Sequence, residues 1–285
     1  MGGLGSEAQK LVWEGAIPLE IRLHESEITT HPPPPPALIL GPRLAYLPLL
    51  AHQLKPYFSD TLPPGADTVW FDYRGLPLKW HIPIGVLFDL LCGEPERPWN
   101  LTVHFRGYPT DILSPCEDED SVKWSFINSL KEAAYIINGN CKNIMNMSQA
   151  DQLDLWRSLV NGKLLTLYDT LKILLPELFE AEPSIDQELS RINIEESRTT
   201  ETTSNPQDLE NAINSRCKEM KETPDECQSE SFPYRKTEIK LVRIQGIEPK
   251  LDIPFAWVVK NLTNPDHFLH ISVFVNASLD QTNLR

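Results

Sequence analysis

The spacing of apolar residues predicts an alternating order of strands and helices in the first part of the chain. Apolar and polar residues alternate over the second half of Val12–Leu23, which predicts a half-buried strand, whereas Tyr46–Phe58 repeats apolar residues at helical spacing. A second, short helix is expected after Pro83, which suits a first helical turn. Further strands are predicted over Ala37–Leu40, Thr68–Tyr73, Leu76–Ile82 and Leu101–Phe105. This order of elements is that of a β-grasp, or ubiquitin-like, module.

A stretch near the C-terminus repeats part of this pattern. The segment IKLVRIQGIEPKLDIPFAWVVKNL is similar to the earlier segment VWFDYRGLPLKWHIPIGVLFDLL. Gly246 takes the place of Gly75, and Pro254 takes the place of Pro83. The repeat predicts a second, related module over Thr166–Val275. The first copy has two strands before its helix and the second copy has none, so the second module is expected to be incomplete.

Three helices are predicted between the two copies. Acidic residues and an N-cap favour a helix that starts at Ser121, and Gly139 is expected to end it. Capping boxes that begin at Ser148 and Thr166 predict two further helix starts. The predicted fold class is therefore α+β, with two ubiquitin-like (β-grasp) modules that flank a helix-rich segment and with the second module incomplete.

Composition changes abruptly after the third predicted helix. Between Glu180 and Glu230 there are 14 acidic residues, 5 basic residues and no aromatic residue. We expect a disordered insertion here, because the stretch has too little apolar area to offset its chain entropy. The expected organisation is a flexible N-terminus (1–11), a first ubiquitin-like domain (12–110), a helix-rich domain (111–162), an incomplete second ubiquitin-like domain (163–278) with a disordered acidic insertion (180–236), and a flexible C-terminus (279–285).

The charge of the chain narrows the class of partner. A formal net charge of −14 repels phosphate backbones and anionic lipid headgroups, which weighs against nucleic-acid binding and against a polybasic membrane patch. Partners are expected to be proteins, with basic faces. No apolar run approaches the length of a transmembrane span and no signal sequence is evident, so the chain is predicted to be cytoplasmic.

Signatures of catalysis or of metal binding are missing from the sequence. The five cysteines form no C-x-x-C pair, the histidines show no H-x-x-x-H spacing, and there is neither a Gly-rich phosphate loop nor a G-x-S-x-G motif. We therefore expect no catalytic residue, no metal ion and no cofactor, and we expect that the chain is not an enzyme by itself.

Two short features allow more than one interpretation. The five residues Pro32–Pro36 are expected to form a stiff polyproline spacer, although such a run can also be a ligand of SH3-type domains. The first six residues match the N-myristoylation pattern at Gly2, although a flexible start without a role explains them equally.

Longer motifs carry a specific resemblance. VWEGAIPLEIRLH, RLAYLPLL, PWNLTVHFRGYP and NSLKEAAYIING, together with the two repeated runs, are similar to the autophagy-related protein 5 family in its plant form. The resemblance implies two ubiquitin-like domains around a helix-rich one. It also implies covalent attachment of the ubiquitin-like autophagy-related protein 12 and binding of a helix of autophagy-related protein 16. The complex would work with the conjugating enzyme of the autophagy-related protein 8 pathway to promote lipidation of that protein at the preautophagosomal membrane.

The resemblance also implies a modification site. The family's acceptor lysine lies in the motif that matches SLKEA, which places the isopeptide acceptor at Lys131, with Lys123 and Lys142 as the next candidates. On helical spacing Lys131 stands at the border of an apolar stripe, a place where a lysine commonly packs its methylenes whatever its role. Two rival functions stay open: a non-conjugated adaptor that binds partner helices, and a cysteine-based transfer enzyme.

The chain departs from the family at one place. The linker and the opening strand hairpin of the second ubiquitin-like domain are missing between Gly162 and Leu165, so the chain resembles a shortened form. In a β-grasp sheet the first strand pairs with the last. We therefore expect Phe268–Val275 to be an unprotected edge strand, the second module to be loosened, and capture of the protein 16 helix to be weakened.

Overall fold

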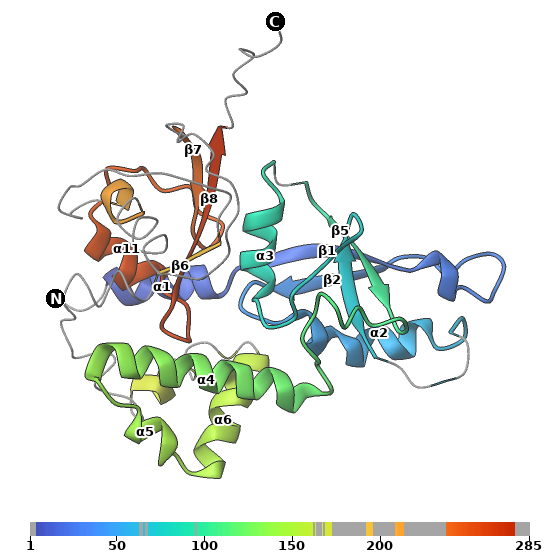
Figure 1. The fold of residues 1–285 in the computed structure, drawn as a ribbon, viewed down its shortest axis with the longest axis horizontal. Helices are drawn as coiled ribbons and strands as arrows, with labels where there is room; N and C mark the ends of the chain where they lie inside the picture. Colours follow the sequence, from blue (N-terminus) through green and yellow to red (C-terminus); the bar gives the residue numbers. More distant parts are fainter. Residues whose placement is uncertain are drawn as a thin grey trace, which may run out of the picture.

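The computed structural model describes residues 4–161 except 63, 64, 66, 67 and 95, and then residues 163, 167, 169–172, 192–195, 209–213 and 238–276. The first module is built on a five-stranded sheet in the order β2-β1-β5-β3-β4 (Figure 1). Its strands are β1 (Ala16–Leu23), β2 (Ala37–Pro42), β3 (Trp70–Tyr73), β4 (Leu76–Pro77) and β5 (Trp99–His104). The central pair, β1 and β5, is parallel, and the other pairs are antiparallel. This arrangement confirms the predicted β-grasp order.

Alternation along β1 explains where the first core lies. Ile17, Leu19, Ile21 and Leu23 are all buried, while the residues between them are more exposed, because successive side chains point to opposite faces of a strand. The buried face is covered by the 3-10 helix η2 (Leu47–Leu50), α2 (Ala51–Phe58) and α3 (Ile84–Leu91). A further 3-10 turn, η1 (Glu25–Glu27), follows β1. The prediction of one helix over Tyr46–Phe58 thus holds, with its first turn wound as 3-10.

The N-terminal segment is a helix and not a flexible tail. Helix α1 spans Leu4–Trp13, so the expectation of flexibility over 1–11 is wrong for residues 4–11, and the predicted strand start at Val12 is four residues too early. Helix α1 packs on the second module, where Trp13 Nε1 donates a buried hydrogen bond of 3.0 Å to the carbonyl oxygen of Thr263. Short helices gain most of their stability from such tertiary packing, which the local composition does not reveal.

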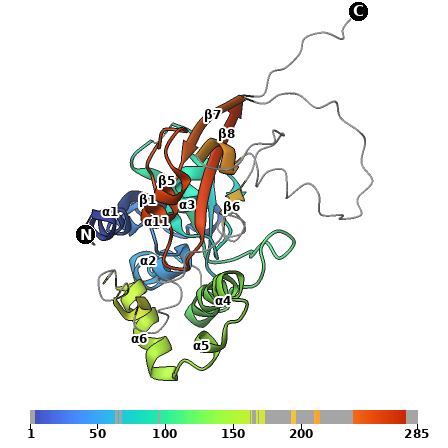
Figure 2. The same cartoon turned by 90° about the vertical axis from the view of Figure 1, so that its left-hand side faces the viewer.

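The helix-rich segment contains α4 (Glu119–Asn138), α5 (Lys142–Met145) and α6 (Gln149–Val160), which lie together on one side of the molecule (Figure 2). Helix α4 begins at Glu119, two residues before the predicted start at Ser121: Asp118 is the N-cap, and its carboxylate accepts a hydrogen bond from the backbone of Ser121. Gly139 ends this helix in the left-handed region, at φ 69°, as predicted. The capping box at Ser148 is also confirmed. The box at Thr166 lies outside the described residues.

The second module repeats the first around a smaller sheet. Its strands β6 (Ile192–Glu195), β8 (Leu269–Asn276) and β7 (Glu238–Arg243) lie in the order β6-β8-β7, next to helix α11 (Phe255–Leu262). Both copies turn through two successive residues with positive φ, Arg74-Gly75 and Gln245-Gly246, with φ near 53° and 80° in each. Two such residues define the type I′ turn that suits a tight strand connection. The internal repeat is therefore confirmed at the level of backbone conformation.

Strand β8 has a neighbour along each of its halves, which corrects one of our expectations. Strand β6 pairs with it in parallel, with Ile192 opposite Leu269 and Glu195 opposite Ser272, and β7 pairs with its other side. Because β1 pairs in parallel with β5 in the first module, β6 stands where the missing first strand of the hairpin would stand. The expectation of an unprotected edge at Phe268–Val275 is therefore wrong for Leu269–Ser272.

The acidic insertion predicted over 180–236 is not wholly disordered. It supplies β6, and it supplies a short helical segment at residues 209–213, in which Leu209, Ala212 and Ile213 are buried in the core of the second module. The backbone amide of Leu209 donates a hydrogen bond to the carbonyl oxygen of Ile253. The low average apolar content of a 51-residue window concealed two short apolar patterns within it.

Buried charged groups connect the two ubiquitin-like modules through α3, which lies between the two sheets (Figure 1). The Arg43 guanidinium pairs with the Asp89 carboxylate, and Asp89 Oδ2 also accepts a hydrogen bond of 2.7 Å from the backbone of Gly246. From the other side, Arg243 donates to the carbonyl oxygens of Cys92 and Gly93. A shared carboxylate thus fixes the first module to the turn of the second.

Candidate functional site

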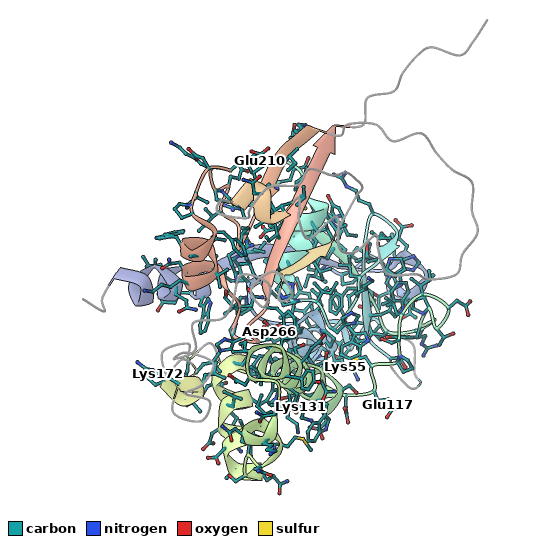
Figure 3. All side chains as sticks on the ribbon, turned by 60° about the vertical axis from the view of Figure 1, so that its left-hand side comes forward. Lys55, Glu117, Lys131, Lys172, Glu210 and Asp266 are labelled. Atoms are coloured by element: carbon teal, nitrogen blue, oxygen red, sulfur yellow. The ribbon has the colours of Figure 1, made fainter. Side chains whose placement is uncertain are left out.

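Helix α4 places Lys131 on the surface of the helical segment, where it is labelled in Figure 3. Leu130 and Ala134 on either side of it are buried, and they join α4 to the core formed with α6. Lys131 itself is half-buried and Glu132 is exposed. The predicted border position is therefore confirmed, and it lets the lysine stem pack on the fold while the amine stays outside.

Two neighbours on the same helix contact the amine of Lys131. Its Nζ donates a hydrogen bond of 3.3 Å to the amide oxygen Oδ1 of Asn128, and it lies 6.0 Å from the centre of the Trp124 ring. Trp124 is 46% exposed, which is unusual for so large an apolar side chain. Our sequence analysis did not find either residue, although their spacing of three and seven residues from Lys131 was a usable signal.

The two alternative lysines have different surroundings. Lys123 Nζ lies 2.5 Å from the Asp120 carboxylate in an ion pair, and only 17% of its side chain is exposed. Lys142 is an exposed residue at the start of the four-residue helix α5. Among the described residues, no carboxylate lies within ion-pair distance of the Lys131 amine. Lys131 therefore combines an accessible amine with a neutral hydrogen-bond partner.

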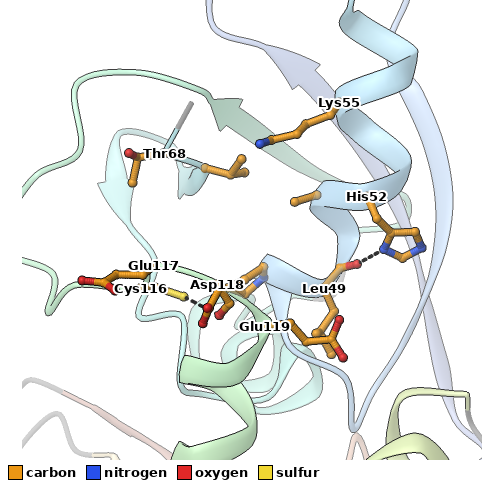
Figure 4. A pocket seen from close by; sticks show the side chains of 11 residues that line it. Leu49, His52, Lys55, Thr68, Cys116, Glu117, Asp118 and Glu119 are labelled. Carbon is orange, nitrogen blue, oxygen red and sulfur yellow. Dashed lines mark hydrogen bonds between the residues drawn. The ribbon is translucent and has the colours of Figure 1, made fainter. Parts of the chain in front are cut away.

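A cavity of about 340 Å³ lies between α2 and the start of α4 (Figure 4). His52 and Lys55 line it from α2, and Cys116, Glu117 and Asp118 line it from the segment before α4. Burial, together with the nearby Asp118 carboxylate, raises the pKa of the Cys116 thiol to about 11. This thiol is therefore protonated at neutral pH, which is the opposite of what nucleophilic catalysis needs.

The other described cysteines are Cys92, which is buried, and Cys141, which is half-buried at the N-cap of α5. Burial raises the pKa of the Cys92 thiol, which lies in the core of the first module. Cys217 and Cys227 lie outside the described residues. Over the part of the chain that the structure describes, no cluster of three metal-binding side chains occurs, and no helix there is long and apolar enough to cross a bilayer.

The fold and the site together define a class of protein. Two β-grasp modules held against a helical segment, with an accessible lysine on its longest described helix, define an α+β protein of the ubiquitin fold. Residues 12–105 match the family described as "Autophagy protein ATG5, UblA domain", and residues 119–176 match "Autophagy protein ATG5, alpha-helical bundle region". The chain belongs to the autophagy protein 5 family.

Similar proteins cover most of the chain. It is 48% identical to Autophagy protein 5 of Arabidopsis thaliana, over 96% of this chain and 99% of that protein, and 42% identical to Autophagy protein 5 of Oryza sativa subsp. indica, over 96% and 95%. The crystal structure of Kluyveromyces marxianus Atg5 matches the fold with a TM-score of 0.71 at 21% identity, over 94% of this chain and 100% of that chain.

The plant alignment bears on the length of the chain. It extends over 338 positions, whereas this chain has 285 residues, so the Arabidopsis protein has residues at positions where this chain has none. The chain is therefore shorter than this relative, as our sequence analysis expected.

Proposed function

We propose that this chain is a non-catalytic scaffold of autophagosome formation that accepts autophagy-related protein 12 on Lys131. With a bound helix of autophagy-related protein 16, the conjugate would promote lipidation of autophagy-related protein 8 by its conjugating enzyme. Membership of the autophagy protein 5 family supports the pathway. The observation that carries the site is the accessible, carboxylate-free amine of Lys131 on α4.

The proposal includes a location in the cell. The chain would be cytoplasmic and would reach the preautophagosomal membrane through its complex. Neither a cofactor nor a metal ion is needed for this role. The net charge of −14 favours protein partners over direct contact with anionic lipid.

Lys131→Arg tests the acceptor directly. Arginine keeps the charge and most of the stem packing but has no amine nucleophile at neutral pH, so we expect the fold to survive and the adduct to disappear. The chain is co-expressed with the modifier and its activating and conjugating enzymes, and the adduct is followed as a thiol-resistant shift in denaturing gels. Lys123→Arg is the matched control on the same helix and should conjugate normally.

The same assay separates the rival functions. No adduct on the unsubstituted chain would favour the non-conjugated adaptor, and a thiol-labile adduct would favour a cysteine-based transfer enzyme. An undiminished adduct on the Lys131→Arg chain would remove Lys131 as the acceptor and would direct attention to Lys123 and Lys142.

A further inference from the structure

Four residues of α4 form one exposed face around Lys131. Trp124, Asn128, Lys131 and Tyr135 follow each other at steps of four, three and four residues, which keeps them on one side of a helix with 3.6 residues per turn. Trp124 and Tyr135 are 46% and 62% exposed, and Asn128 is exposed as well. A protein that reaches the amine of Lys131 would therefore contact the aromatic rings of Trp124 and Tyr135 and the amide of Asn128.

Two lysines lie near the Trp124 ring at similar distances. Lys123 Nζ is 5.4 Å and Lys131 Nζ is 6.0 Å from the centre of its ring. The two amines differ in their polar partner, because Lys123 is held by the Asp120 carboxylate and Lys131 by the neutral amide of Asn128. The ion pair holds the Lys123 amine against Asp120 with only 17% of that side chain exposed, whereas the amide oxygen of Asn128 orients the Lys131 amine without placing a charge beside it.

We propose that Asn128 and Trp124 are positioning residues that direct conjugation to Lys131 and that the Asp120 carboxylate excludes Lys123. This inference rests on the proposed function. In the transfer step the lone pair of Lys131 Nζ attacks the carbonyl carbon of the modifier's C-terminal thioester on the conjugating enzyme. A C–N bond forms, the C–S bond breaks, and the enzyme's sulfur leaves as a thiolate that takes up the proton lost by the amine. Asn128 Oδ1 holds one N–H and so sets the direction of the lone pair.

Asn128→Asp is the first test, because it places a carboxylate where the neutral amide stood with almost no change in size. We expect the rate of conjugation at pH 7.5 to fall about tenfold. The added carboxylate would favour the charged amine, and a rise of about one unit in the pKa of an amine lowers the fraction of free amine tenfold. The rate should recover as the pH is raised. The measurement is the rate–pH profile of single-turnover transfer from the preformed thioester, with thermal unfolding as a check on the fold.

Two further variants provide controls. Asn128→Ala removes the acceptor without adding charge, so it should lower the rate without moving the pH profile. Trp124→Leu keeps an apolar residue but removes the aromatic face, and it should also lower the rate. If the Asn128→Asp profile coincides with that of the unsubstituted chain, the positioning role is wrong.

Asp120→Asn tests the excluded lysine as a gain of function. In the Lys131→Arg background, we expect release of Lys123 from its ion pair to produce a new adduct on Lys123, identified by peptide mass spectrometry. Lys131→Arg with Asp120 intact should give none. Absence of the new adduct would contradict the exclusion by Asp120. Absence of any adduct on the unsubstituted chain would instead contradict the proposed function itself.

Discussion

Lys131 shows how one side chain can be structural and reactive at once. Its neighbours Leu130 and Ala134 are core residues, so the position of its Cα is fixed by the packing of α4 on α6. Its amine nevertheless makes one weak contact with a neutral amide. A fixed stem whose amine contacts only a neutral amide and an aromatic ring is suited to an acceptor, because the fold loses little when the amine is consumed.

His104 is the clearest buried titratable group outside that site. Its Nε2 lies 2.6 Å from Asp72 Oδ2, its Nδ1 lies 3.9 Å from Glu27 Oε1, and its ring stacks on Trp70 and on His24. Burial lowers the pKa of His104 below its usual value, and the hydrogen bond to Asp72 opposes this shift without cancelling it. The imidazole is therefore neutral at pH 7.

This lowered pKa predicts a loss of stability on mild acidification. As the pH falls through about 6.5, the unfolded chain takes up a proton on this histidine before the folded chain does, so unfolding becomes more favourable. The effect stops growing once the pH passes below the pKa of the folded state. The thermal unfolding midpoint should thus decrease as the pH is lowered from 7 to 5.5. His104→Gln should make this dependence of the midpoint on pH less steep.

His81 provides the comparison for this experiment. Burial lowers the pKa of His81 as well, but its side chain is exposed at the surface of the first module. In the His81→Gln chain, the thermal unfolding midpoint should still depend on pH by the amount that His104 contributes. Equal slopes in the His104→Gln and unsubstituted chains would show that this histidine does not titrate on unfolding.

At the scale of elements, β6 is the strand that completes the second sheet. It supplies the parallel partner of β8, the same pairing that β1 gives to β5. Strand β6 pairs with Leu269–Ser272 and β7 pairs with Ser272–Asn276, so each half of β8 has a hydrogen-bonded neighbour. The ordering of the second module therefore depends on four residues of the acidic insertion.

Hydrogen exchange tests this role of β6. We expect amides along Leu269–Ser272 to be protected to a degree comparable with those of β5 in the same molecule. Ile194→Pro removes a backbone donor from the β6 ladder, and it should speed exchange in β8 while leaving β5 unchanged. Fast exchange along Leu269–Ser272 already in the unsubstituted chain would restore our original expectation of a loosened module.

For the whole molecule, the connection between modules rests on buried charges around one turn. Burial raises the pKa of the Asp89 carboxyl, while Arg43, the backbone of Gly246 and Arg243 lower it, and burial has the larger effect. A carboxylate in this position is costly unless its partners stay in place. The arrangement therefore couples the turn of the second module to the helix α3 of the first.

A matched pair of glycines tests that coupling. Gly75 and Gly246 have the same kind of backbone, at φ 82° and 77°, so an alanine at either costs about 1 to 2 kcal/mol of strain. A Cβ at Gly75 would meet nothing within 4 Å, whereas one at Gly246 would lie 2.8 Å from Arg43 Nη1. In urea unfolding, we expect Gly246→Ala to be more destabilising than Gly75→Ala by at least about 1 kcal/mol. Equal destabilisation would mean that the guanidinium moves aside freely and that the contact between modules is loose.

The sequence determined the elements whose signals are local. Alternation along β1, the capping box at Ser148 and the glycine end of α4 depend on neighbouring residues, and each was predictable. The repeat gave the second module because both copies use the same turn chemistry, with glycines at 75 and 246. The border position of Lys131 followed from helical spacing alone.

Only the tertiary structure decided what depends on distant partners. Helix α1 and strand β6 have weak local signals, and each is ordered by the second module, through Trp13 and Thr263 in one case and through β8 in the other. The buried pair of Arg43 and Asp89 could not be predicted, because 46 residues separate its members and a charged residue alone predicts exposure. Local patterns determine elements over a few residues, whereas burial and pairing are decided by segments that meet only after the chain has folded.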